Sequence, residues 1–129
     1  MHISPNSKYI VPWLYTTISM VVIMILIGGI TRLTDSGLSM VEWRPIWGFL
    51  PPISDEEWKR VFSLYMSSPE YIFKNQGMGI TEFKEIFFWE YFHRLWGRLI
   101  GLVFIIPLII FYLFNKIPNS ILFKLLIIL

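Results

Sequence analysis

The chain has 129 residues, a formal net charge of +2 at pH 7 and no cysteine. The length allows one domain at most, the small charge does not indicate a nucleic-acid-binding protein, and the lack of cysteine excludes disulfides and thiolate metal sites. Hydrophobic residues make up 55% of the chain and charged residues 16%, against roughly 25% charged residues in ordinary soluble domains. This composition favours a membrane protein.

The first predicted element is a membrane-spanning helix over about residues 10–30. This run of 21 residues carries no charge and is about 31 Å long as a helix, close to the thickness of a bilayer core. It is too long for the apolar part of a typical secretory signal, and no Arg-rich mitochondrial presequence precedes it. A second uncharged run covers residues 99–114. The two runs predict an integral membrane protein, and the lack of a mitochondrial presequence favours the bacterial cytoplasmic (inner) membrane.

The segment over about residues 31–81 is predicted to be an extramembrane loop. Glycine, aspartate and serine between residues 28 and 37 indicate that the first helix stops there and that a turn follows. Residues 43–52 are rich in Pro, Trp and Gly, which is typical of chain lying at a membrane surface.

Parts of this loop are predicted to be helical. Residues 54–57 form a capping box, which predicts a short helix through about Met66 with one apolar face. A turn or short helix is expected from Ser68, and glycines break the chain over residues 76–79. Thr81 is predicted to be the N-cap of the next helix.

The second span is predicted within a long helix over about residues 82–114, interrupted only by Pro107. These 33 residues correspond to about 50 Å, more than the bilayer core, so the first turns must lie at or above the interface. A polar connection over residues 115–119 follows, and the chain becomes apolar again from about Ser120. Because the remaining residues are too few to cross a bilayer, we expect a truncated third span and interpret the chain as an N-terminal fragment or truncated gene product.

The charges leave the side of the loop open. Residues 31–85 hold six Lys or Arg, against Lys8 and Lys116 on the other side, which would place the loop in the cytoplasm. The loop is close to the length at which this rule loses force, and it also contains eight acidic residues. Charge alone therefore does not decide the topology.

Residues that can carry chemistry gather before the second uncharged run. Apart from His2, His93 is the only histidine in the sequence. Helical spacing places Glu90, His93, Gly97 and Gly101 along one stripe. Such a stripe predicts room beside the helix for a flat macrocycle, with the His93 imidazole as an axial ligand of heme iron.

Two arginines lie on the adjacent face of the same helix. Arg94 and Arg98 are one turn apart, and their guanidinium groups can pair with carboxylates such as heme propionates. Interfacial arginines also extend to lipid headgroups, and for these two residues alone that interpretation is the simpler one.

The stripe itself has alternative interpretations. The spacing of Gly97 and Gly101 is a GxxxG pattern, which is more often a helix-packing face. A single interfacial histidine is more often a structural residue, and Glu90 can simply face water. The spacing of Glu90 and His93 also matches the Glu-x-x-His of di-iron bundles, but such sites need a second copy, which the sequence lacks. The residues alone leave a heme site and a structural helix both open.

A longer set of motifs resembles the heme A synthase family. The stretch GGITRLTDSGLSMVEW, over residues 28–43, resembles the segment that follows the first span in that family. The resemblance resumes at Pro51-Pro52, Glu57-Trp58, Tyr65, Pro69-Glu70-Tyr71, Asn75, Gly77-Met78, Phe83-Lys84 and Ile86-Phe87. It continues in Trp89-Glu90-Tyr91-Phe92-His93-Arg94 and Gly97-Arg98, so it covers about residues 28–101. In having no cysteine, the chain is similar to the mitochondrial-like, cysteine-free branch of that family.

The resemblance implies an eight-helix membrane protein with two similar four-helix halves and the first loop on the outer side. It implies oxidation of a porphyrin methyl of heme O to the formyl of heme A by successive hydroxylations, for cytochrome oxidase biogenesis. His93 is similar to the first histidine of the half that receives heme O, and Glu90 to the acid proposed to steady a cationic intermediate. A heme b is implied in the C-terminal half, which this sequence does not include.

The resemblance also implies partners. These are membrane lipids, heme O, the C-terminal half or further copies of the chain, heme O synthase and an electron donor. The second histidine of the N-terminal half lies beyond this sequence, so we expect no heme A synthase activity from the chain by itself. A non-catalytic heme-binding or structural membrane subunit, or an inactive truncated product, is the alternative.

Overall fold

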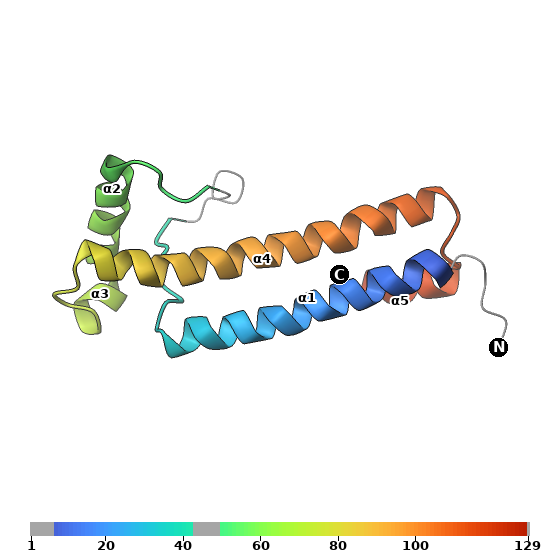
Figure 1. Cartoon of the computed structure of the whole chain (residues 1–129), viewed down its shortest axis with the longest axis horizontal. Helices are drawn as coiled ribbons and strands as arrows, with labels where there is room; N and C mark the ends of the chain where they lie inside the picture. Colours follow the sequence, from blue (N-terminus) through green and yellow to red (C-terminus); the bar gives the residue numbers. More distant parts are fainter. Residues whose placement is uncertain (1–6, 43–49, 129) are drawn as a thin grey trace. The chain divides into compact units, whose positions relative to one another are not determined.

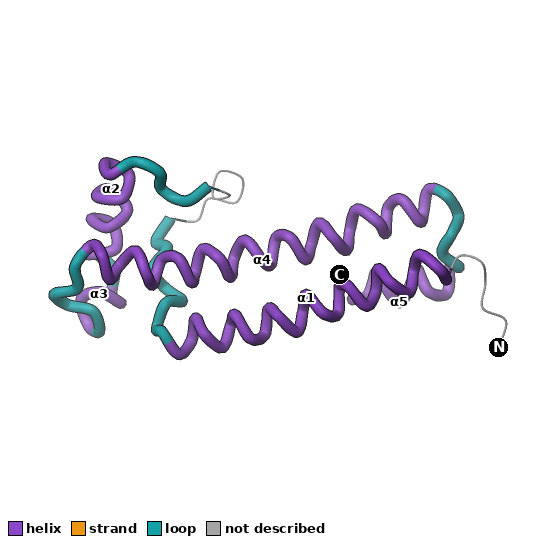
Figure 2. The backbone as a smooth tube through the Cα atoms, viewed as in Figure 1, coloured by secondary structure: helices purple, strands orange, loops and turns teal. Residues whose placement is uncertain are grey.

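The computed structural model describes residues 7–42 and 50–128, and its regular secondary structure in these ranges is entirely helical (Figure 1). The helices are α1 (Ser7–Leu33), α2 (Asp55–Met66), α3 (Pro69–Phe73), α4 (Ile80–Leu113) and α5 (Asn119–Ile128). Loops and turns connect them, as Figure 2 shows. His2 and most of the predicted surface stretch, residues 43–49, lie outside the described residues.

Two helices are long and apolar enough to cross a membrane, α1 over Lys8–Leu33 and α4 over Ile80–Leu113. Many of their large apolar side chains are exposed, among them Ile25, Leu26 and Ile106. Such a surface is unfavourable in water and normal against lipid tails. The fold class predicted from the sequence, an all-α membrane protein with two spans, is confirmed.

The two long helices end in the same way. At the end of α1, Asp35 has a φ of 50° and the N–H of Ser36 donates to the carbonyl of Thr31 over 2.9 Å. At the end of α4, Asn115 has a φ of 51° and the N–H of Lys116 donates to the carbonyl of Phe111 over 2.8 Å. Asp and Asn tolerate this left-handed conformation, and the bond satisfies a carbonyl that has lost its helical partner. Helix α1 continues through Gly28 and Gly29, where the sequence pattern placed the end of the first span, and the predicted turn follows Leu33.

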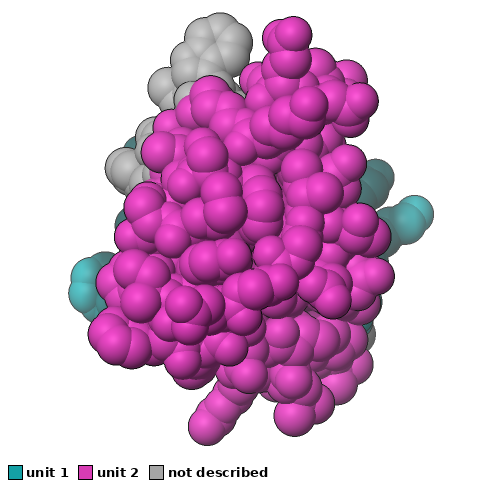
Figure 3. All heavy atoms as spheres, turned by 90° about the vertical axis from the view of Figure 1, so that its left-hand side faces the viewer, with its two compact units in different colours: residues 1–23, 98–129 teal, residues 24–97 magenta. Residues whose placement is uncertain are grey.

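The chain divides into two compact units, residues 1–23 with 98–129 and residues 24–97 (Figure 3). We call the first the distal unit and the second the loop unit. The distal unit has an apolar core made of side chains from α1, α4, α5 and the connection between α4 and α5: Ile10, Trp13, Leu108, Ile117 and Leu125. The Trp13 indole stacks on Phe104, with ring centroids 5.3 Å apart.

A polar contact crosses the core of the distal unit. Pro107 lies inside α4 and has no backbone N–H, so the carbonyl of Val103, four residues earlier, loses its helical donor. The indole Nε1 of Trp13 donates to that carbonyl over 2.8 Å. A neighbouring helix thus satisfies the backbone group that proline leaves open, which is how spanning helices tolerate proline.

The loop unit is built around the first turns of α4. Helix α2 lies across that end of α4 (Figure 1), and Tyr65, Phe83 and Phe87 form the buried core there. The Trp58 ring meets the Phe87 ring edge-on, with centroids 5.1 Å apart. Burial raises the pKa of Tyr65, whose hydroxyl accepts a hydrogen bond from Asn75 over 2.7 Å.

The helix caps of the loop unit follow the sequence closely, with one exception. The side chains of Ser54 and Ser68 accept hydrogen bonds from backbone N–H groups at the starts of α2 and α3, so both predicted starts are confirmed. The predicted N-cap at Thr81 is wrong, because α4 begins at Ile80. There the carboxylate of Glu82 reaches back to the N–H of Gly79 over 2.8 Å and satisfies it without a capping hydroxyl.

Candidate functional site

Glu90 lies on α4 and is buried in the loop unit, with 3% of its surface exposed. Its Oε2 accepts hydrogen bonds from the Ser39 hydroxyl and from the Met40 backbone N–H, each 2.7 Å long. Its Oε1 pairs with Nη2 of Arg94, one helical turn later, at 2.5 Å. A buried carboxylate is tolerated when its oxygens are paired in this way. The alternative that Glu90 simply faces water is therefore wrong.

The two candidate arginines differ in their surroundings. Arg94 forms an ion pair with Glu90 through Nη2, and 30% of its side chain remains exposed. A guanidinium has five N–H donors, so this ion pair leaves donors for a second anion. Arg98 is half-buried and belongs to the distal unit.

His93 is half-buried in the loop unit, and neither of its ring nitrogens makes a hydrogen bond to the residues that the structure describes. Its Nε2 faces α1 at Gly28, where an added Cβ would lie only 3.3 Å from that nitrogen. A side chain at position 28 would therefore press on the imidazole. Glycine at this position lets the backbone of α1 approach the ring.

The two glycines of the predicted stripe have different neighbours. A Cβ on Gly97 would lie 3.3 Å from the terminal methyl of Met24, so that side chain lies beside this glycine. Around Gly101, in the distal unit, a Cβ would meet nothing within 4 Å. The structure brings Glu90, Arg94 and His93 into one unit and adds α1 to their surroundings, whereas Arg98 and Gly101 belong to the other unit.

The chemistry of these residues fits a heme. An imidazole without a hydrogen bond is a suitable axial ligand, and the remaining donors of Arg94 suit a carboxylate. A porphyrin does not fit between Nε2 and α1 as they stand, because a metal–imidazole bond of about 2 Å and a ring contact of about 3.5 Å exceed the space at Gly28. Iron binding at Nε2 therefore requires the ring to turn away from α1. Among the described residues, no three His, Asp or Glu side chains gather as a separate metal site.

Sequence reasoning missed three residues of this site. Ser39 and Met40 hold Glu90, and Gly28 faces His93, yet none was assigned a role. All three belong to the stretch at 28–43 that carries the family resemblance, and this was the only signal that pointed to them. Helical spacing finds residues on one helix and does not reveal which other segment packs against them.

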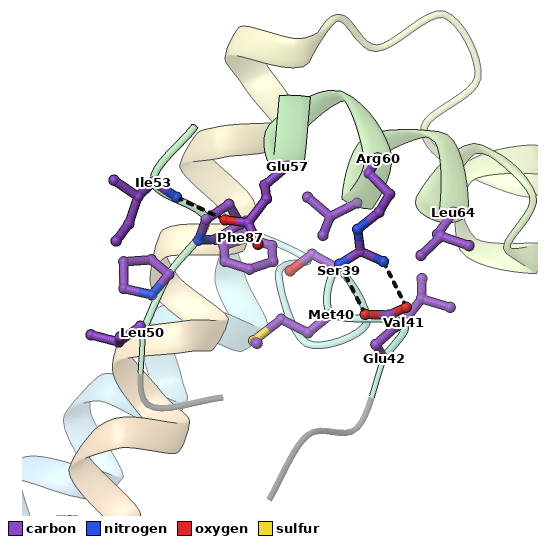
Figure 4. A pocket seen from close by; sticks show the side chains of 13 residues that line it. Ser39, Met40, Val41, Glu42, Leu50, Ile53, Glu57, Arg60, Leu64 and Phe87 are labelled. Carbon is purple, nitrogen blue, oxygen red and sulfur yellow. Dashed lines mark hydrogen bonds and ion pairs between the residues drawn. The ribbon is translucent and has the colours of Figure 1, made fainter. Parts of the chain in front are cut away.

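A pocket of about 410 Å³ opens in the loop unit beside Ser39 and Met40 (Figure 4). Most of its walls are apolar, made of Val41, Leu50, Val61, Leu64 and Phe87 among others. Arg60 and Glu42 form a two-pronged ion pair in its lining, with N–O distances of 2.8 and 3.2 Å, and this hydrogen bonding raises the pKa of Arg60. Ser39 and Met40 thus line the pocket, and both also donate hydrogen bonds to Glu90.

Comparison with known proteins decides the family. Residues 12–129 match the COX15-CtaA family, described as cytochrome oxidase assembly protein. This chain belongs to that family. Similar curated relatives are heme A synthases from bacteria. The one from Granulibacter bethesdensis is 46% identical over 123 residues, which cover 95% of this chain and 33% of the relative.

Two further relatives have a higher sequence identity to this chain, over shorter stretches. The heme A synthase of Rickettsia bellii is 54% identical over 112 residues, covering 87% of this chain and 33% of the relative. The heme A synthase of Paramagnetospirillum magneticum is 52% identical over 108 residues, which cover 84% of this chain and 30% of the relative. The chain therefore spans about one third of the length of these relatives. No solved structure matches it.

Proposed function

We propose that this chain provides the substrate-binding part of a heme A synthase. The whole protein would oxidise a porphyrin methyl of heme O to the formyl of heme A through successive hydroxylations. Methyl plus water gives formyl, two electron pairs and four protons, so a redox partner has to take up the electrons. The support is the family match over residues 12–129 together with relatives named heme A synthase.

Within this proposal His93 binds the heme iron and the charged residues orient the substrate. Arg94 and Arg98 would pair with the propionates of heme O. The Glu90 carboxylate would face positive charge that develops on the substrate, in a site from which water is excluded and electrostatic effects are strong. Because Glu90 already forms an ion pair with Arg94, a change in either residue would affect both heme binding and the reaction.

One observation carries the proposal: the imidazole of His93 lacks a hydrogen bond within the described part of the chain, one turn from a buried carboxylate–guanidinium pair. An imidazole whose nitrogens are left unpaired is available to a ligand.

We further propose that the protein lies in the bacterial cytoplasmic membrane with residues 31–81 on the outer side. The support for the bacterial membrane is that the relatives compared above are bacterial. The outer side of the loop is what the resemblance of residues 28–101 implies. Membrane lipids, the remaining part of the protein, heme O synthase and an electron donor are the partners that the proposal requires. A heme b would be held outside residues 1–129.

The test is a chimera in which residues 12–129 replace the matching part of the Rickettsia bellii relative. It is expressed in a host that makes heme O and lacks its own heme A synthase, and membrane hemes are separated by chromatography. We expect heme A from the chimera and none from the 129-residue chain alone. A folded chimera that binds heme O without producing heme A would instead support a non-catalytic heme-binding subunit.

The arginines are tested in the same chimera by Arg→Lys substitution, which keeps the charge and loses the planar fork. Arg94→Lys and Arg98→Lys should each weaken heme O binding if the guanidinium groups hold the propionates. Parent-like affinity in both variants would favour lipid headgroups as their partners.

A further inference from the structure

The contact between Ser39 and Glu90 joins two segments that are far apart in the sequence. Ser39 follows the end of α1, has 2% of its surface exposed, and donates to Glu90 Oε2 over 2.7 Å. Its hydroxyl is also 3.4 Å from the carbonyl of Ile86. A hydroxyl has one proton, and the shorter bond to a charged acceptor is the stronger of the two. The proton of Ser39 is therefore directed at Glu90.

The turn after α1 fixes the position of this hydroxyl. The N–H of Ser36 bonds to the carbonyl of Thr31, and the N–H of Ser39 bonds to the carbonyl of Ser36 over 3.4 Å. Ser39 is thus presented by a turn that backbone hydrogen bonds hold. The hydroxyl of Ser36, which is fully buried, bonds to Thr34 and to neither Ser39 nor Glu90.

We propose that Ser39 is a positioning residue for the Glu90 carboxylate, an inference that rests on the proposed function. Ser39 and Met40 hold Oε2 while Arg94 holds Oε1, so the plane of the carboxylate is fixed from two sides. Without the hydroxyl, only the Met40 N–H opposes the attraction of Arg94. The carboxylate then turns toward Arg94 and away from the geometry that the reaction needs, and rates are sensitive to displacements of this size.

The chain offers a matched control for a merely structural role. Ser36 and Ser39 are both buried serines of one turn, but only Ser39 contacts Glu90. Ser36→Ala and Ser39→Ala each remove one hydroxyl from that turn. Ser39→Thr keeps the hydroxyl, and its rate is compared per amount of folded protein in the membrane.

The experiment measures the rate of heme A formation, the KM for heme O and the amount of folded protein in the chimera. We expect Ser39→Ala to lower the turnover rate about tenfold, as for loss of a hydrogen bond to a charged group, with the KM unchanged. Ser39→Thr should restore most of the rate, and Ser36→Ala should leave it unchanged. Equal losses in both alanine variants, or a parent-like rate in Ser39→Ala, would overturn the inference.

An infrared measurement separates this inference from the proposed function. The carboxylate band of Glu90 is assigned by difference against Glu90→Gln in the folded chimera. It should shift in Ser39→Ala and remain in place in Ser36→Ala, whether or not the chimera produces heme A. An unshifted band in Ser39→Ala overturns the positioning role, whereas a shifted band in a chimera without heme A production refutes only the proposed function.

Discussion

The distal unit and the loop unit each contain a polar group that is paired with a donor from another segment, and the number of donors differs. In the distal unit the group is the neutral carbonyl of Val103, and one indole N–H from Trp13 satisfies it. In the loop unit the group is the charged carboxylate of Glu90, which has three donors from two segments. The difference follows from electrostatics, because removing a charge from water costs far more than removing a carbonyl.

The comparison also separates architecture from chemistry. The distal unit uses its polar contact to keep a proline-containing helix intact, and aromatic packing surrounds the bond. The loop unit places its polar contact one turn from an imidazole without a hydrogen bond to any described residue. We therefore expect substitution of Trp13 to change stability and substitution of His93 or Glu90 to change heme binding or turnover.

The largest expected effect is the loss of bound heme when the iron ligand is removed. His93→Ala in the chimera should abolish the absorbance of heme bound in the N-terminal half, because no other described residue nearby offers an imidazole. Trp13→Phe is the control from the distal unit and should leave the heme content per folded protein unchanged. Heme absorbance that persists in His93→Ala would show that the loop unit does not hold the iron.

Glu90→Gln should affect both chemistry and folding. If the glutamine oxygen accepts from Ser39 and Met40, its NH₂ group faces the guanidinium of Arg94, and donor then meets donor. We expect the free energy of unfolding to fall by about 1–3 kcal/mol and heme O to accumulate in the membranes. Denaturant titration in detergent and chromatography of the hemes check the two parts. A variant with parent-like stability and parent-like heme A output would contradict the assignment of Glu90 to the site.

Trp13→Phe should lower the stability of the distal unit by about 1 kcal/mol, because the carbonyl of Val103 then lacks a donor. Pro107→Ala provides the matched background, since alanine returns the helical N–H to that carbonyl. In Pro107→Ala the Trp13→Phe substitution should cost clearly less, as measured by a double-mutant cycle of unfolding free energies. Equal costs in both backgrounds would mean that Trp13 contributes through packing alone.

The smallest effect is expected from the glycine pair of α1. Gly28 faces the His93 ring, whereas a Cβ on the neighbouring Gly29 would meet nothing within 4 Å. Gly29→Ala should stabilise the helix by up to about 1 kcal/mol, and Gly28→Ala should lose part of that gain and shift the spectrum of bound heme. Identical stabilities and identical spectra for the two variants would show that Gly28 and His93 do not meet in the folded protein.

Local features of this protein were predictable from the sequence. Uncharged runs predicted α1 and α4, and the serines at 54 and 68 predicted the starts of α2 and α3, because each of these signals acts within a few residues of the chain. Thr81 failed as a cap because α4 already begins at Ile80, where the side chain of Glu82 bonds back to the N–H of Gly79. The sequence pattern did not distinguish a helix that begins at Ile80 from one that begins after Thr81.

The sequence by itself determined the class of the protein, its helices and the helix turn that carries Glu90, His93 and Arg94, since helical periodicity places those residues near one another wherever the helix lies. Only the tertiary structure decided what each of them contacts. Glu90 meets Ser39, 51 residues away in the chain, and His93 meets Gly28 on another helix. Such contacts depend on how a turn and two helices pack, and no spacing rule within one segment encodes that packing.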